Sequence, residues 1–306
     1  MRVGLVDVDG HHFPNLALMK LSAWHKAQGD CVEWYAPLFT HPERIYASKV
    51  FTFTRDYNEY LPRDPEPIKG GTGYDASVKL PDEVETMKPD YSIYPQFTEA
   101  YGFLTRGCVR NCPWCIVPKK EGAIRIVGDI EQIARSGRRE VVLMDNNFLA
   151  APAEFVKEQC EKIKRLQLRM DFNQGLDARL VTEENAGHLA KIRFIARVRI
   201  ACDRPEMLPI IRRAVTLLRG AGIKQEIFCY MLFKDDIAEA ENRARELLKM
   251  KVTPFAQPYR DFSGKTELSD NQKIFARYVN IKGGKIVLKM KFKDYYSGTK
   301  KAEVLA

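Results

Sequence analysis

Several features of membrane and secreted proteins are missing from this sequence. Its 306 residues contain no run of about eighteen apolar residues, the length that a membrane-spanning helix needs. The first residues, MRVGLVDVDGHHF, also lack the basic region, apolar stretch and cleavage site of a signal peptide. We therefore expect a soluble cytoplasmic protein that makes no contact with a membrane.

Histidine is scarce, and cysteine is unevenly placed. The five histidines all lie far in sequence from the one cysteine cluster: His11, His12, His25, His41 and His188. Four of the seven cysteines are scattered without a paired spacing: Cys31, Cys160, Cys202 and Cys229. This scatter predicts free, buried thiols in a reducing compartment and gives no support to a disulfide framework.

The other three cysteines, Cys108, Cys112 and Cys115, stand together in the stretch GFLTRGCVRNCPWCIVPKKEG. An odd number cannot all pair as disulfides, and spacing this tight would strain most pairings, so a metal is the better interpretation. Structural zinc usually takes four Cys or His ligands; no fourth lies nearby in sequence, although a histidine could approach in space. A 4Fe-4S cluster suits thiolates equally well, and three of them would leave one iron open to a non-protein ligand.

The N-terminal segment predicts a small parallel sheet. RVGLVDV indicates a strand, NLALMKLSAWHKAQG has helical apolar spacing from Asn15 as N-cap to Gly29, and CVEWY indicates a second strand. A β-α-β unit of this kind implies parallel strands. Residues 55–90, rich in Pro, Gly and charge, predict a long irregular connection, and DYSIYP offers one more strand.

From residue 101 onward the pattern becomes regular, with helical segments between strand candidates. Thr182 with Asn185 begins one helix, Asp203 with Pro205 begins another, and glycines follow two of the helix ends. Six β/α repeats in this length predict an α/β fold with a parallel, curved sheet, an open or partial barrel. The strand candidates are YGFLT, EVVLMD, LRMDFNQ, RFIARVRIAC, KQEIFCYML and VTPFAQPY.

Polar side chains follow four of these strands directly. The carboxyl ends of parallel strands meet at one edge of a sheet, where active sites of such folds lie, so these residues should converge. After the first strand come the three cysteines; after the next three come Asp145, Asn146 and Asn147, then Gln174, Gly175 and Asp177, then Asp203.

These residues resemble the radical S-adenosylmethionine (SAM) enzymes. The resemblance rests on Cys108-x3-Cys112-x2-Cys115 in a loop after the first strand, with Trp114 before the last cysteine, and it covers roughly residues 97–262. It implies a partial (β/α)6 barrel in which three cysteines hold a 4Fe-4S cluster and SAM chelates the open iron. Reductive cleavage of SAM then gives a 5′-deoxyadenosyl radical that takes hydrogen from a substrate.

By the same resemblance, LMDNNF looks like the segment that binds the SAM amino group, with Asp145-Asn146-Asn147 in place of the common Gly-Gly-Glu. NQGLDARL, with Gln174, Asp177 and Arg179, and ACDRPE, with Asp203, look like the positions around the SAM ribose and carboxylate. Asp can accept from ammonium and hydroxyl groups, and Arg can pair with a carboxylate. Asp203 as a helix N-cap and Arg179 as a surface charge are the alternatives.

The N-terminal domain resembles the Rossmann-like module that precedes the barrel in cobalamin-dependent relatives. DGHHFP resembles the cobalamin motif Asp-x-His-x-x-Gly, with His11 at the ligand position and Pro14 replacing the glycine. Ser48 and Gly70-Gly71 fall loosely where further cobalamin contacts would lie. The proline fixes φ and removes a donor, so cobalamin is the less favoured interpretation, and the alternative is a histidine pair that caps a loop or contacts substrate.

Positive charge gathers at the C-terminus. Residues 264–306 hold ten Lys or Arg and four Asp or Glu, so +6 of the net charge of +9 lies there. Within this stretch KIVLKMKFK alternates apolar and basic residues, which predicts an edge strand protected by lysines. The alternative is an arm that binds RNA through its charge.

We therefore predict three segments: a Rossmann-like domain (1–96), a radical SAM barrel (97–262) and a basic extension (263–306). The expected function is SAM cleavage by an iron-sulfur enzyme that acts on an unknown substrate with a one-electron donor such as flavodoxin or ferredoxin. A zinc-stabilised, non-catalytic RNA-binding module is the first alternative, and an RNA-modifying radical SAM enzyme is the second. No spacing among the remaining cysteines supports an auxiliary cluster.

Overall fold

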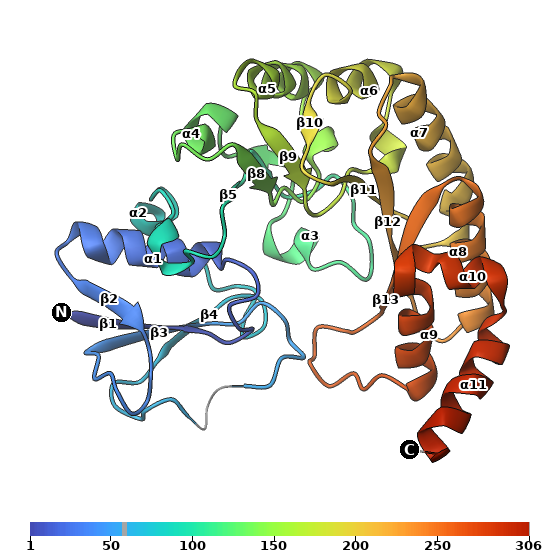
Figure 1. Ribbon diagram of the computed structural model, residues 1–306. Coiled ribbons are helices and arrows are strands. Elements are labelled where there is room, and N and C mark those ends of the chain that lie inside the picture. Colours follow the sequence, from blue (N-terminus) through green and yellow to red (C-terminus); the bar gives the residue numbers. More distant parts are fainter. Residues whose placement is uncertain (57–59, 306) are drawn as a thin grey trace. The chain divides into compact units, whose positions relative to one another are not determined.

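The computed structural model describes residues 1–56 and 60–305, with side chains described as far as residue 299. It is a mixed α/β structure with parallel sheets (Figure 1). Two compact units divide the chain: Met1–Tyr101 with Asp261–Thr266, and Gly102–Arg260 with Glu267–Ala306. The predicted segments 1–96, 97–262 and 263–306 stay predictions. None of the described helices has the length and apolar character needed to span a bilayer.

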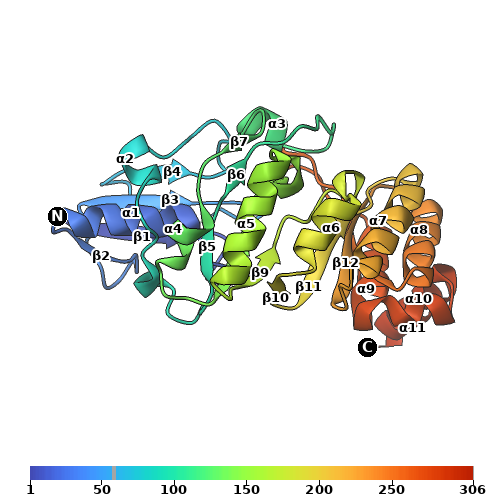
Figure 2. The same ribbon diagram turned by 90° about the horizontal axis from the view of Figure 1, so that it is seen from above.

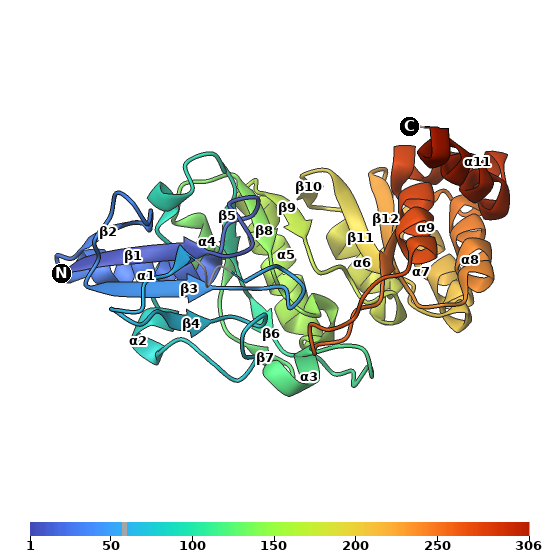
Figure 3. The ribbon, with the colours of Figure 1, turned by 90° about the horizontal axis from the view of Figure 1, so that it is seen from below.

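The first unit contains one four-stranded parallel sheet, with the order β2-β1-β3-β4. Helix α1 (Leu16–Ala27) connects the first two strands, and the Asn15 side chain caps it by accepting from the Leu18 N–H at 3.3 Å. The predicted β-α-β unit and its N-cap are therefore confirmed. The strands are β1 (Arg2–Asp7), β2 (Cys31–Trp34), β3 (Arg44–Ser48) and β4 (Ile68–Gly70), which Figure 3 shows from below.

Two elements of the first unit differ from the expectation. DYSIYP is not a strand: Tyr91–Ile93 forms a 3-10 turn (η2), because the Asp90 side chain accepts from the Ser92 N–H at 2.9 Å and favours a local turn over a ladder. Strand β4 lies inside the stretch that we expected to be irregular. A short helix, α2 (Asp82–Glu85), precedes the turn.

The first unit is held together by a core of Val3, Leu5, Leu18, Leu21 and Val84. His25 is fully buried beside this core. Its Nδ1 lies 2.7 Å from Asp30 and its Nε2 lies 3.0 Å from the Tyr46 hydroxyl, so both ring nitrogens have partners. His25 is therefore a structural residue.

The second unit has two parallel sheets. One has the order β10-β9-β8-β5 and the other β11-β12-β13. An isolated parallel bridge between Leu176 and Ile200 connects them. Each of the six predicted strands overlaps a strand of the structure, and the fourth is interrupted. The strands are β5 (Ala100–Gly102), β8 (Glu140–Leu143), β9 (Arg169–Phe172), β10 (Arg193–Phe194), β11 (Arg197–Ala201), β12 (Glu226–Phe233) and β13 (Val252–Pro258).

Helices cover one side of these strands, as Figures 1 and 2 show. On β11 Val198 and Ile200 are buried, whereas Arg197 and Arg199, which alternate with them, are only partly buried. Both faces of a parallel sheet are usually apolar. The partly buried arginines of β11 therefore depart from the usual pattern. The covering helices are α4 (Ile130–Ala134), α5 (Ala153–Arg165), α6 (Glu183–Leu189), α7 (Leu208–Gly220) and α8 (Ile237–Lys249), whereas the short helix α3 (Val117–Lys120) lies on the other side of the strands.

The predicted helix boundaries of the second unit are largely confirmed. Thr182 and Asn185 form a capping box at the start of α6, with side-chain to backbone hydrogen bonds in both directions. Gly137 and Gly222 follow helices α4 and α7 with φ of 77° and 99°. Asp203 is not an N-cap, because Arg204 holds that position before the 3-10 turn η5 (Pro205–Met207).

The predicted strand KIVLKMKFK is wrong, since this stretch forms helix α10 (Lys285–Lys289) and the start of α11 (Phe292–Leu305). Val287 and Phe292 are buried, and the Phe292 ring packs 5.2 Å from Phe275 and 5.6 Å from Tyr278 of helix α9 (Asp270–Asn280). Burial of these two side chains against α9 therefore outweighs the alternating pattern. Figure 3 shows α9 and α11 beside each other at the end of this unit.

Candidate functional site at the carboxyl ends of the second unit's strands

The three cysteines lie on a loop that is closed at its base. Strands β6 (Thr105–Arg106) and β7 (Arg125–Ile126) pair antiparallel on either side of it, and the Cys108 N–H donates to the Gly122 carbonyl at 3.2 Å. Gly107 has a φ of +83°, and a Cβ there would lie 2.2 Å from the Ala123 carbonyl oxygen. Only glycine fits at this close approach, so Gly107 determines where the loop begins.

Within the loop, the cysteines are accessible to different degrees. Cys108 and Cys112 are half-buried and Cys115 is exposed. The Cys115 N–H donates to the Cys112 carbonyl at 3.0 Å, so these two residues share a turn just before helix α3. Partial desolvation, with Cys112 and Cys108 adding to it, raises the pKa of the Cys115 thiol.

Asp145 and Asn146, which follow β8, support this loop from beneath. The Asp145 carboxylate is 4% exposed and accepts from the N–H groups of Leu104 and Thr105 at 2.9 and 2.7 Å and from the Thr105 hydroxyl at 2.6 Å. Asn146 Oδ1 accepts from the Gly107 N–H at 2.9 Å. Burial raises the pKa of Asp145 to about 6, although these hydrogen bonds oppose the shift. Both side chains therefore accept hydrogen bonds from the backbone N–H groups that lead into the cysteine loop.

Asn147 faces the cysteine loop and has an unused acceptor. The side chain is 3% exposed, and its Nδ2 lies 3.4 Å from the Cys108 sulfur and 3.3 Å from Asp177 Oδ2. Its Oδ1 is buried, and no hydrogen-bond donor reaches it from the described part of the chain. A buried acceptor without a donor costs about 1–3 kcal/mol, so Asn147 is a place where a ligand's donor would bind.

Asp177 connects Asn147 with two arginines. Its carboxylate accepts from Arg179 Nε at 2.7 Å and from Arg110 Nε at 3.0 Å, and it also caps the 3-10 turn η4 (Ala178–Leu180). Burial would raise the pKa of Asp177, but the two guanidinium groups outweigh it and the pKa is lowered. Arg179 also interacts with the Cys112 thiol. Arg179 is therefore part of the cluster and not an isolated surface charge.

Trp114 and Asp203 form a second contact across the site. The Trp114 side chain lies near the Asp203 carboxylate, which accepts from the Leu232 N–H at 3.1 Å. Burial raises the pKa of Asp203. The Arg204 guanidinium lies over the Trp114 ring, 4.6 Å from its centroid. These contacts bring the loop after β11 to the cysteine loop.

A polar network joins strands of the two sheets. Arg199 of β11 donates to both carboxylate oxygens of Asp171 on β9, at 2.7 and 2.6 Å, and to the Tyr230 hydroxyl of β12 at 3.0 Å. The Phe228 and Phe255 rings lie beside it, 5.4 Å apart. Side chains on three strands of two sheets thus form one partly exposed surface of polar and aromatic groups.

The predicted site residues fall into three groups. Asn147, Asp177 and Arg179 connect Cys108 with Cys112, and the separate pair Trp114 and Asp203 lies beside them with Cys115. Asp145 and Asn146 lie underneath as supports, and Gln174 is exposed at its turn. Sequence reasoning missed Arg110, Arg204 and the network around Arg199. Arg110 stands between two of the cysteines, and an arginine inside a ligand motif was the available signal.

The cysteine loop does not present a closed metal site by itself. In residues 1–56 and 60–305, no group of three or more His, Cys, Asp or Glu side chains is arranged to hold a metal ion. Metal sites commonly form only as the metal binds, because thiolates repel one another without it. Three soft thiols on one loop, with the unused Asn147 acceptor beside Cys108, fit an iron-sulfur cluster and a small polar ligand.

The cobalamin candidates of the first unit have other partners. The His11 ring packs 4.1 Å from the Trp34 ring, and burial with the His12 charge lowers the pKa of His11. The Ser48 hydroxyl accepts from Asn15 Nδ2 at 2.9 Å in a buried contact. A Cβ at Gly71 would lie 2.4 Å from the Lys49 carbonyl, and Gly70 belongs to β4. Cobalamin binding here stays a prediction.

Comparison with known proteins adds no family assignment. No protein-family model matches the chain, and no curated protein matches it in sequence.

Proposed function

We propose that this protein is a radical SAM enzyme. The observation that carries the proposal is the convergence around Asn147: its amide contacts Cys108 and Asp177, and its buried Oδ1 has no donor among the described residues. These groups come from loops after β6, β8 and β9, at the edge where parallel α/β sheets bind ligands. The Asn147 amide lies 3.4 Å from the Cys108 sulfur. One cofactor would therefore contact both a cluster held by Cys108 and the Asn147 side chain.

Each residue would have a distinct role in such a site. Cys108, Cys112 and Cys115 would hold a 4Fe-4S cluster, and the Asn147 Oδ1 would accept from the SAM ammonium. With both groups bound, the chemistry supplied would be one-electron cleavage of SAM to a carbon radical that takes hydrogen from a substrate. Asp177 orients Arg179 and Arg110, whose guanidinium groups would pair with the SAM carboxylate.

The two sheets of the second unit would form one partial (β/α)6 barrel. The Leu176–Ile200 bridge and the Arg199 hydrogen bond to Asp171 both cross from one sheet to the other. The face that carries this network is polar and partly exposed, as a ligand-binding lumen requires. A substrate would bind there, close to the cysteine loop.

Charge favours an acidic partner for the second unit. Residues 102–260 and 267–306 hold 38 Lys or Arg and 24 Asp or Glu, a net charge of +14. A surface of this sign attracts acidic proteins and accelerates their association. An acidic one-electron donor protein such as a flavodoxin or ferredoxin fits this requirement.

The same charge also favours the RNA-modifying alternative. An RNA substrate would release counterions on binding, so its affinity would fall linearly with the logarithm of salt concentration. Association with an acidic electron donor would also weaken with salt, so the two partners are separated by direct measurement of each: filter binding of RNA, and reduction kinetics with a flavodoxin.

The proposed function is tested by anaerobic reconstitution with iron and sulfide, followed by reduction in the presence of SAM. We expect release of 5′-deoxyadenosine and methionine by the wild type and by Cys31→Ala, which removes an exposed thiol of the first unit. Cys112→Ala should neither form the brown chromophore nor cleave SAM. Bound zinc without iron or sulfide would instead support the non-catalytic binding module.

A further inference from the structure

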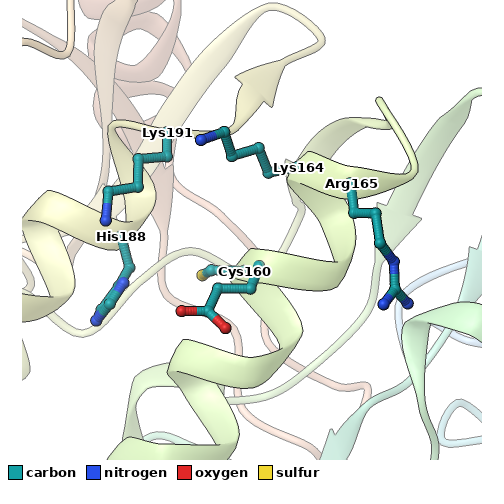
Figure 4. Close-up of a pocket in the computed structure, with 6 residues that line it drawn as sticks. Cys160, Lys164, Arg165, His188 and Lys191 are labelled. Carbon is teal, nitrogen blue, oxygen red and sulfur yellow. The ribbon is translucent and has the colours of Figure 1, made fainter.

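A second cavity of the same unit lies between the C-terminal parts of helices α5 and α6, outside the site described above (Figure 4). Its volume is about 340 Å³. Helices α5 and α6 follow strands β8 and β9 and return toward the opposite edge of the sheet, so the cavity uses none of the residues of the cysteine site. It is lined by Cys160, Glu161, Lys164, Arg165, His188 and Lys191.

The lining is mainly cationic, and its charges are incompletely compensated. Arg165 pairs with Glu131 of helix α4. Lys164 and Lys191 are exposed, and neither has a carboxylate within 4 Å in the described part of the chain. In Figure 4 the ammonium of Lys164 extends toward Lys191 across the cavity. The remaining lining carboxylate, Glu161, offsets only one of these positive charges.

His188 contributes a donor or acceptor that no protein group uses. Its side chain is 12% exposed, its Nδ1 is buried, and no partner reaches Nδ1 among the residues that the structure describes. The Nε2 atom lies 3.9 Å from Glu184, a weak contact. The neighbouring Cys160 thiol is neutral, because burial raises its pKa to about 12, and it forms an uncharged part of the wall.

Helix dipoles explain basic residues at these positions only in part. The C-terminal end of a helix favours Lys, Arg or His by about 0.3–1 kcal/mol, which accounts for each cation on its own helix. It does not account for a concave space between two helices with an unpartnered imidazole nitrogen in its wall. Lysines, arginine and imidazole around one cavity are the set that proteins use for phosphate groups.

We propose that this cavity binds the phosphate group of a small phosphorylated molecule. Lys164 supplies an ammonium group from helix α5 and Lys191 supplies one from the turn after helix α6, and the His188 Nδ1–H donates to a phosphate oxygen. A cavity of this size holds a phosphate and a small attached group, whereas an RNA backbone needs an extended groove. The proposal does not depend on the function of the cysteine site, and the ligand would bind as an effector or a positioning group.

The test is calorimetric titration of the full chain with pyrophosphate at constant ionic strength. The double variant Lys164→Ala/Lys191→Ala should weaken binding by about tenfold or more, since two charge-assisted contacts are lost. Glu161→Gln should strengthen binding by about threefold or more, because it removes the one repelling carboxylate. Lys157→Ala, on the same helix but paired with Glu154 outside the cavity, should change it less than about twofold.

A second measurement follows the His188 ring by long-range ¹H–¹⁵N NMR, in which pyrophosphate should shift the Nδ1 resonance. Helicity measured by circular dichroism should be equal in all variants, because the two lysines are exposed. Equal pyrophosphate affinity in the wild type and the double variant would overturn the proposal. So would binding of a twelve-nucleotide RNA that needs Lys164 and Lys191 while pyrophosphate does not bind.

Discussion

The two units both place polar residues at the carboxyl ends of parallel strands, but they use them differently. In the first unit, Asp9 accepts from the Thr54 hydroxyl and from the Val50 and Phe51 N–H groups, and Asp7 accepts from the Tyr94 hydroxyl. In the second unit, Asn147 keeps an acceptor without a donor, beside thiols on a loop. The carboxylates of the first unit have hydrogen-bond donors within the protein, whereas the Asn147 acceptor of the second unit is left for a ligand.

The two units also differ in net charge. The first holds 11 Lys or Arg and 16 Asp or Glu, a net charge of −5, against +14 for the second. Residues 267–306 supply nine of the 38 basic residues and four of the acidic ones, so most of the surplus lies on residues 102–260. The basic character that the sequence seemed to confine to the C-terminus therefore belongs to the whole second unit.

The largest expected effect concerns SAM binding at the second unit's strand ends. Asn147→Ala should weaken SAM affinity by about 1.5–3 kcal/mol, the value of a hydrogen bond to a charged group, and leave the iron content unchanged. Gln174→Ala, at an exposed position near the same edge, should have less than about a threefold effect. Anaerobic calorimetry measures both, and equal affinities in the two variants would remove Asn147 from the SAM site.

The next effect concerns the base of the cysteine loop. Gly107→Ala should lower the free energy of unfolding by about 1–3 kcal/mol, because its Cβ would collide with the Ala123 carbonyl and its φ is positive. Gly122→Ala also has a positive φ, but a Cβ there meets nothing within 4 Å, so it should cost less. Urea unfolding, with thiol alkylation rates as a local probe, distinguishes them. If both variants lose the same free energy of unfolding, the positive φ alone, and not the close approach of the Ala123 carbonyl, would account for the effect at Gly107.

A third prediction compares buried carboxylates of the two units by pH. Burial raises the pKa of both Asp7 and Asp145 to about 6, from 3.8. A raised pKa in the folded state means that stability is fully present below about pH 4 and is lost as pH rises to about 6, by on the order of 3 kcal/mol for Asp145. Urea titrations between pH 4 and 7 should show this slope in the wild type.

The corresponding amide variants should differ. In Asp7→Asn the side-chain oxygen can still accept from the Tyr94 hydroxyl, so the slope should flatten at little cost. In Asp145→Asn the amide NH₂ faces a backbone N–H of Leu104 or Thr105, so the variant should lose about 1–3 kcal/mol as well as the slope. A slope that survives in both variants would assign the pH dependence to other groups.

The smallest effect concerns the C-terminal lysines. Changing Lys289, Lys291 and Lys293 to Ser lowers the second unit's charge from +14 to +11, so any RNA binding should change its salt slope by at most about two to three. Leu288 and Met290 are already exposed in a helical segment, so we expect no aggregation of the strand-edge type. Aggregation of the triple variant would indicate that the stretch can form a strand.

Sequence patterns predicted the elements whose signals are local. The Asn15 cap, the Thr182–Asn185 capping box and the second unit's strands depend on residues a few positions apart. The C-terminal stretch failed because its alternation competes with burial of Val287 and Phe292 against α9, a contact distant in sequence. The role of Asp145 was equally hidden, since its partners Leu104 and Thr105 lie some forty residues away.

The central claim is that the second unit's open edge holds an iron-sulfur cluster which SAM contacts directly. The most direct test is electron paramagnetic resonance of the reduced, anaerobically reconstituted protein with and without SAM. We predict about four iron and four sulfide per chain and a cluster signal that changes when SAM is added, in the wild type but not in Asn147→Ala at the same SAM concentration. A zinc-containing protein without iron, or a cluster signal that SAM leaves unchanged, would contradict the account.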